Sequence, residues 1–76
     1  MQPYLNLSGE SGVTQYELGP DFIDVEFGPK GTYRYTDQRV DREKVERMKK
    51  LAVAGRGLGT FINKDPLVKN GFVKVP

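Results

Sequence analysis

The 76 residues include no cysteine, no histidine and no tryptophan. Without thiolate or imidazole groups the chain lacks the ligands of a typical zinc site, and it lacks the nucleophile–base pairs of Ser-His-Asp and Cys-His catalysis. No disulfide can form, so a domain of this size depends on its own packing for stability. We therefore expect no metal, no cofactor and no enzymatic activity.

Targeting and membrane signals are also missing. The N-terminus has neither the basic nor the apolar region of a signal peptide, and no apolar run approaches the ~18 residues that cross a bilayer. We expect a soluble, cytoplasmic protein of one domain, a monomer or a weak dimer with no membrane partner.

Basic residues are absent from the first part of the chain. Residues 1–29 carry five carboxylates and no lysine or arginine, whereas all twelve basic residues follow from Lys30 onward beside five acidic ones. The two parts therefore have net charges of −5 and +7. If the fold separates them, one surface repels phosphate and the other attracts it. Ordinary solubilising surface charge explains the same split equally well.

Three runs have the composition of β-strands, and turn residues separate them. Val13–Leu18 is followed by Gly19-Pro20-Asp21, and Phe22–Phe27 leads through a second turn with glycine and proline to Thr32–Thr36. Strands joined by such short turns predict a three-stranded antiparallel meander.

The two ends of the chain are less clearly patterned. Residues 1–12 end in a stretch rich in serine and glycine and predict a flexible N-terminal segment, which leaves residues 13–76 as a single domain. Tyr4–Leu7 and Phe72–Val75 are candidates for an added edge strand, and the sequence leaves both open.

The second hairpin has a predicted register. A four-residue loop would place Val25 opposite Arg34 and mix apolar and charged groups on one face. A three-residue loop, Pro29-Lys30-Gly31, instead pairs Val25 with Tyr35 and Glu26 with Arg34. Such a loop needs glycine at positive φ in its last position, which Gly31 supplies. We predict the three-residue loop.

The two-residue period of a strand then assigns the side chains to faces. One face is expected to be the core, with Tyr16, Leu18, Ile23, Val25, Phe27, Tyr33 and Tyr35. The other is expected to be solvated and acidic, with Glu17, Asp24, Glu26 and Arg34. Tyr33-Arg34-Tyr35 also resembles an RNA-stacking platform, but tyrosines that share the apolar face are better explained as core residues.

One main helix follows the strands. Asp41 is a suitable N-cap, and Gly55 ends the helical pattern after Ala54. Its buried stripe is expected to be Val45, Met48, Leu51 and Ala52. Packed on the apolar sheet face, this helix predicts a small two-layer α+β domain. Short C-terminal helical turns are expected at Thr60–Asn63 and Pro66–Lys69.

The glycine-rich segment Gly55–Thr60 follows a helix, which is the wrong context for a dinucleotide fingerprint. A helix C-cap followed by a tight turn explains it better. If Thr60 caps the next short helix, Arg56 beside that helix start predicts a small anion site formed by Arg56 and Thr60.

Basic residues lie along the main helix and the segment after it. The candidate nucleic-acid contacts are Arg42, Lys49, Lys50, Arg56 and Lys64. They are interleaved with acidic residues on the helix, so they form a weaker signal than an uninterrupted basic run.

Several short motifs resemble the KTSC domain, a bacterial domain of about this length that occurs alone and at the C-terminus of some lysyl-tRNA synthetases. The similarity lies in Phe27-Gly28, in Tyr33-Arg34-Tyr35 and in Gly59-Thr60-Phe61-Ile62-Asn63, with Ser11 and Tyr16 upstream. The family often continues after its Asn with an Ile-Arg-like step, whereas this chain has Lys64-Asp65-Pro66-Leu67. The resemblance implies the α+β fold, and RNA binding has been suggested for the family.

The sequence as a whole predicts a small binding module with nucleic acid, RNA first, as its partner through the basic helix and C-terminal surface. The alternative is a protein–protein module, an accessory protein or a phage-type inhibitor, that uses the acidic sheet face or an edge strand.

Overall fold

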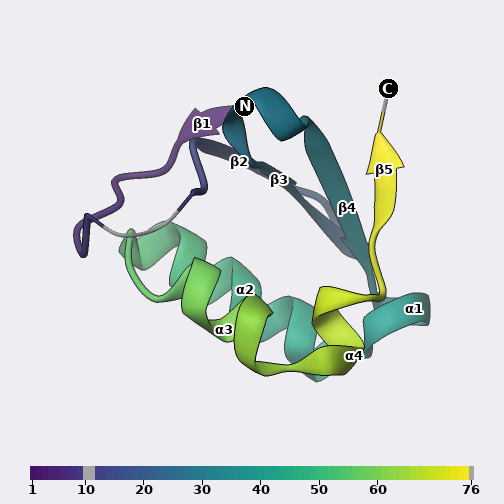
Figure 1. The fold of residues 1–76 in the computed structure, drawn as a ribbon. Coiled ribbons are helices and arrows are strands. Elements are labelled where there is room, and N and C mark those ends of the chain that lie inside the picture. Colours follow the sequence, from purple (N-terminus) through teal and green to yellow (C-terminus); the bar gives the residue numbers. More distant parts are fainter. Residues whose placement is uncertain (10–11, 76) are drawn as a thin grey trace.

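The structure is a computed structural model that describes residues 1–9 and 12–75. Within this part of the chain, five strands form one antiparallel sheet in the order β1-β2-β3-β4-β5, and the helices cover one of its faces (Figure 1). The strands are β1 (Gln2–Pro3), β2 (Gln15–Leu18), β3 (Phe22–Glu26), β4 (Thr32–Thr36) and β5 (Val73–Val75). The predicted two-layer α+β meander is confirmed, and each end of the chain adds a short edge strand to it.

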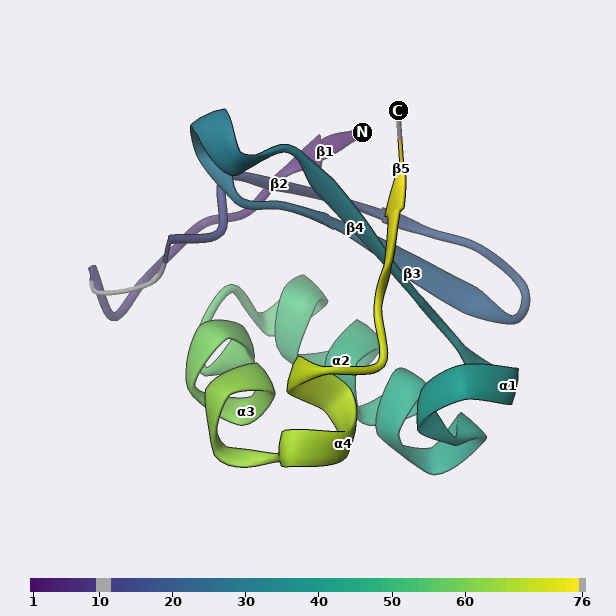
Figure 2. The same cartoon turned by 45° about the vertical axis from the view of Figure 1, so that its right-hand side comes forward.

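The helices form the second layer beneath the sheet (Figure 2). They are α1 (Asp37–Val40), α2 (Arg42–Ala54), α3 (Leu58–Lys64) and α4 (Pro66–Lys69). The two predicted C-terminal turns are confirmed as α3 and α4, although α3 begins two residues earlier than expected. Among the described residues, no helix combines the length and the apolar character needed to cross a membrane.

The main helix α2 has the predicted bounds. Val45, Met48 and Ala52 are buried, and Leu51 is half-buried at the margin of the stripe. Gly55 ends the helix in the left-handed conformation with φ 79°, and its amide donates to the Leu51 and Ala52 carbonyls.

Asp41 precedes α2 but does not cap it through its side chain. The reason is a helix that the sequence analysis missed. Thr36 accepts a hydrogen bond from the Arg39 amide and starts α1, and the Asp41 amide donates to the Asp37 carbonyl as α1 ends. Asp41 therefore joins two helices directly, and its backbone takes φ 92° at this junction.

The predicted register of the second hairpin is wrong by two residues. Val25 lies opposite Tyr33, and Asp24 lies opposite Arg34. The loop begins one residue earlier than expected, because residues 28–30 form a 3₁₀ turn and the Phe27 amide donates to the Gly31 carbonyl to close it. Gly31 has the predicted positive φ, 99°, but with ψ −167° it is not in the helical left-handed region.

The observed register aligns an ion pair. Both oxygens of Asp24 accept hydrogen bonds from Arg34, at 2.8 and 3.0 Å, and the guanidinium lies 4.1 Å from the centre of the Phe22 ring. The hydrogen bond to Asp24 is the main cause that raises the pKa of Arg34. Glu17 lies directly opposite Asp24, and Arg34 offsets the repulsion between the two carboxylates.

A shift of two residues leaves every side chain on its predicted face, since strands alternate with a period of two. Tyr16, Ile23, Val25 and Tyr35 are buried in the core. Three predicted core residues are less buried than expected: Leu18 ends β2 and is 42% exposed, and Phe27 and Tyr33 are half-buried. On the other face Asp24 is 4% exposed, so its prediction as a solvated residue is wrong, since its carboxylate is paired with Arg34.

The N-terminal residues take part in the domain. β1 pairs with β2 at Gln2–Pro3 instead of Tyr4–Leu7, because Tyr4 turns into the core, where it is 6% exposed. Its hydroxyl accepts a hydrogen bond from the Leu58 amide at 3.2 Å. The domain therefore begins before residue 13, and residues 10–11 of the predicted flexible segment lie outside the described residues.

Candidate functional site

The basic residues proposed from the sequence do not form one cluster. Lys49 is held by the protein itself: its amine donates to the Gly19 carbonyl at 2.7 Å and pairs with Glu46 at 3.0 Å. This lysine ties α2 to the β2–β3 turn and is a poor candidate for a phosphate contact.

The other four candidates are exposed but spread apart. Arg42 begins α2, Lys50 lies on its outer side, Arg56 follows its C-terminus and Lys64 ends α3. A helix of 13 residues is about 20 Å long, so Arg42 and Arg56 stand at opposite ends of it. Within the described part of the chain, none of the four is in an ion pair.

The predicted anion site of Arg56 and Thr60 is not formed as expected. Thr60 is the third residue of α3, and Gly57, in the left-handed conformation with φ 81°, occupies the N-cap position. A glycine has no side chain to bind the helix start, and Thr60 is too far into the helix to replace it. Thr60 is exposed and lies beside a cavity instead.

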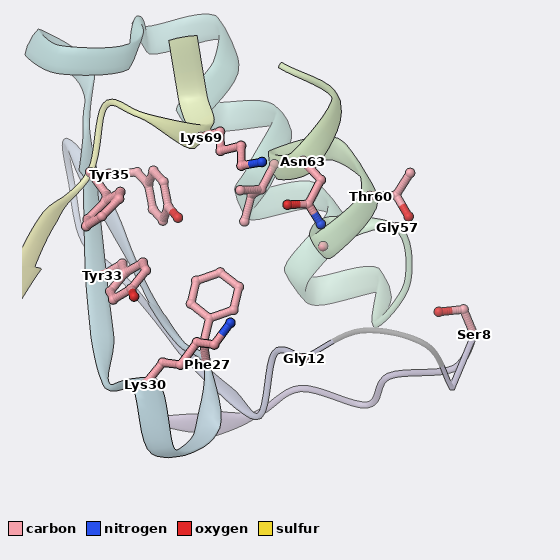
Figure 3. A pocket seen from close by; sticks show the side chains of 13 residues that line it. Ser8, Gly12, Phe27, Lys30, Tyr33, Tyr35, Gly57, Thr60, Asn63 and Lys69 are labelled. Carbon is pink, nitrogen blue, oxygen red and sulfur yellow. The ribbon is translucent and has the colours of Figure 1, made fainter. Parts of the chain in front are cut away.

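This cavity, of about 460 Å³, opens between the apolar face of the sheet and α3 (Figure 3). Strand and loop residues form one wall, α3 forms the other, and the segments before β2 and β5 complete the lining. The described lining residues are Ser8, Gly12, Phe27, Lys30, Tyr33, Tyr35, Gly57, Gly59, Thr60, Ile62, Asn63, Lys69 and Phe72. Its volume is within the range of small-molecule sites.

Stacked aromatic rings make the sheet-side wall. The rings of Tyr33 and Phe72 are parallel within 8°, with centroids 4.2 Å apart, and Phe27 packs against Tyr33 at 5.1 Å in a tilted arrangement. Tyr33 is therefore a half-buried wall residue, and its prediction as a core residue is wrong in this respect. The sheet-side wall of the cavity is therefore aromatic.

Tyr35 lies deeper than Tyr33. Its ring is 1% exposed, as predicted for a core residue, and its hydroxyl points into the cavity (Figure 3). Burial, with a smaller contribution from Tyr33, raises the pKa of Tyr35. The hydroxyl thus keeps its proton at neutral pH and can both donate and accept a hydrogen bond.

Lysines stand at both ends of the aromatic wall. Lys30, from the 3₁₀ turn, and Lys69, from α4, line the cavity and extend toward it from opposite ends (Figure 3). Lys74 lies opposite Tyr33 in the β4–β5 pairing and so projects from the same sheet face, with its chain passing close to Gly31. Lys30 and Lys74 therefore flank Gly31 at one end, and Lys69 stands at the other.

The sequence analysis did not place Lys30, Lys69 or Lys74 among the candidate contacts. A signal for the cavity was nevertheless present. The motifs that resemble the KTSC domain supply much of its lining, namely Phe27, Tyr33, Tyr35, Gly59, Thr60, Ile62 and Asn63.

The chain matches no protein family model, no curated protein and no solved structure. Its resemblance to the KTSC domain therefore stays a prediction.

Proposed function

We propose that this protein is a small, non-enzymatic module that binds single-stranded nucleic acid, RNA first, and receives an unpaired base in the cavity between the sheet and α3. One observation carries the proposal: the stacked aromatic wall has lysines at both of its ends. Proteins that bind single strands combine these two elements, aromatic rings for the bases and cations for the phosphates.

The energetics favour this combination. A base stacked on an aromatic side chain contributes about 1–3 kcal/mol, and every base has a π-face. Lys30 and Lys74 project on the same side of the sheet as Tyr33, so a base on that ring brings its phosphate toward their amines. The base-stacking contact needs an unpaired base, since a paired base already stacks on its neighbours.

The residues predicted from the sequence fit as an extension of this contact. Arg56 directly precedes Gly57, and Lys64 directly follows Asn63, and both of these neighbours line the cavity. A strand that leaves the cavity along α3 would meet these two exposed side chains. Lys49, Arg42 and Lys50 belong to α2 and are at most peripheral to this path.

The acidic sheet face supports the protein-binding alternative less well. Its carboxylates already have partners within the chain: Glu17 pairs with the N-terminal amine at 3.5 Å, Asp24 with Arg34, and Glu26 accepts from Thr14 at 2.7 Å. The edge strands β1 and β5 have two and three residues, and such short edges offer little backbone for strand addition.

The test is equilibrium binding followed by fluorescence anisotropy with a labelled ten-nucleotide RNA, single-stranded or annealed to its complement. The proposal predicts that the single strand binds with Kd below about 10⁻⁴ M at ~0.15 M salt, more weakly as salt rises. It also predicts weaker binding of the duplex despite its greater charge. Millimolar affinity for the single strand, or equal affinity for the duplex, would contradict base insertion.

A control tests whether RNA contacts the acidic sheet face. Reversing the charge at Glu17 changes the acidic face and should leave RNA binding unchanged or slightly tighter, because that face is remote from the cavity. Loss of RNA binding in that variant would place the contact on the wrong face.

A further inference from the structure

The Tyr35 side chain is buried, but its hydroxyl opens onto the cavity. The residue is 1% exposed, and within residues 1–9 and 12–75 its hydroxyl makes no hydrogen bond, although it points into the cavity (Figure 3). The other two buried tyrosines are different: the Tyr16 hydroxyl bonds the Gln2 side chain at 3.2 Å, and the Tyr4 hydroxyl bonds the Leu58 amide. A hydroxyl that faces a cavity and has no partner in the described part of the protein can both donate and accept a hydrogen bond, so Tyr35 is suited to bonding a ligand.

Two more polar side chains lie at the same end of the cavity. Asn63 extends its amide from α3, and Lys69 extends its amine from α4 toward the region that the Tyr35 hydroxyl faces (Figure 3). The amide offers both donors and an acceptor, but an ammonium group offers donors alone. Because Lys69 adds donors alone, the polar groups at this end of the cavity offer more hydrogen-bond donors than acceptors.

We propose that Tyr35, Asn63 and Lys69 read the edge of the inserted base and favour uracil or guanine, whose O4 or O6 carbonyl stands where cytosine and adenine carry an amino group. This inference rests on the proposed RNA binding and adds base selectivity to it. The carbonyl oxygens of guanine and of thymine-like bases accept hydrogen bonds at the position where adenine and cytosine present an amino group. An amino group at that position can donate to Tyr35 or Asn63 but cannot accept from Lys69, so one hydrogen bond is lost.

The division of roles follows from the two ends of the cavity. Lys30 and Lys74 stand by the 3₁₀ turn and hold the phosphate, while Tyr35 and its neighbours at the α4 end contact the base edge. Selectivity is then separable from general affinity for single strands.

The experiment compares three ten-nucleotide RNAs, oligo(U), oligo(A) and oligo(C), against the wild-type protein and two variants at one salt concentration. Wild type should bind oligo(U) roughly tenfold more tightly than the other two, the size expected for one or two hydrogen bonds to a base edge. Tyr35→Phe keeps the ring and removes the hydroxyl, so it should lose most of the oligo(U) preference and keep its affinity for oligo(C). Tyr16→Phe is the matched control, because it removes a hydroxyl remote from the cavity and should behave as wild type.

Lys69→Met keeps the proposal testable if Tyr35→Phe does not fold, since Lys69 is exposed and its replacement does not disturb the core. It too should lower the oligo(U) preference. If wild type binds all three RNAs equally, or if both variants keep the full preference, base reading at this site is wrong and general single-strand binding stands. If no RNA binds, both proposals fail.

Discussion

Neutralising the two lysines beside Gly31 should weaken RNA binding by a calculable amount. In the double variant Lys30→Gln/Lys74→Gln, the wall of Tyr33 and Phe72 is intact, but the amines proposed to hold phosphate are lost. Each phosphate contact on a single strand contributes ~0.7 to the slope of log K against log salt. The slope should therefore become shallower by about 1.4.

The same relation gives the loss of affinity. At ~0.15 M salt a slope of ~0.7 corresponds to about a fourfold change for each contact, so the double variant should bind about 15-fold more weakly, and the difference should vanish near 1 M salt. Anisotropy titrations at four or five salt concentrations measure both quantities in one experiment.

A matched variant controls for net charge. Arg42→Gln/Lys50→Gln also lowers the formal charge from +2 to zero, but it does so on α2, away from the cavity. Its slope should change little. If the α2 variant loses as much affinity as the cavity variant, the protein binds RNA through diffuse charge and the cavity has no special role.

Three further predictions concern stability. Gly31→Val forces a β-branched residue into φ 99° and should cost about 1–3 kcal/mol in the free energy of unfolding, measured by urea titration; an unchanged midpoint would show that the loop relaxes freely. Tyr35→Ala should cost about 3 kcal/mol or more, whereas Tyr33→Ala, at a half-buried wall position, should cost roughly 1–2 kcal/mol, and equal losses would contradict the difference in their burial. The hydrogen bond from Lys44, and then the Val68 and Leu67 amides, lower the pKa of Asp65, so the unfolded chain takes up the proton first as pH falls. The stabilisation from this carboxylate is present above its ordinary pKa and is lost as the pH falls through the lower folded value. Asp65→Asn should therefore lose less stability than wild type below about pH 5. An identical dependence of stability on pH in the variant would contradict this.

The strands and the main helix were predictable because local pattern decides them. Val45, Met48 and Ala52 recur at helical spacing, and a glycine at positive φ ends the helix as its lack of a Cβ allows. The hairpin register was not predictable, since the 3₁₀ turn at Gly28–Lys30 and the predicted loop Pro29–Gly31 have the same length and overlap in sequence. The hydrogen bond from Arg34 to Asp24 favours the observed register, and it forms only when the two strands lie side by side.

The candidate site was predictable in composition but not in place. The excess of positive charge after residue 29 predicts binding through basic side chains, but the pattern along α2 favoured Arg42 and Lys50 over the lysines at the cavity. The cavity instead depends on long-range contacts. Phe72 stacks on Tyr33 because β5 pairs with β4, and no local pattern in the sequence predicts that pairing.

An NMR titration of the isotope-labelled protein with a short single-stranded RNA tests the central claim most directly, because it locates the contact residue by residue. Backbone amide signals of Phe27, Tyr33, Gly59, Asn63 and Phe72, which line the cavity, should shift together and saturate with one affinity. The signals of Glu17 and Asp24 on the acidic face should stay in place. Shifts confined to α2 or to the acidic face, or no shifts at millimolar RNA, would contradict binding in the cavity.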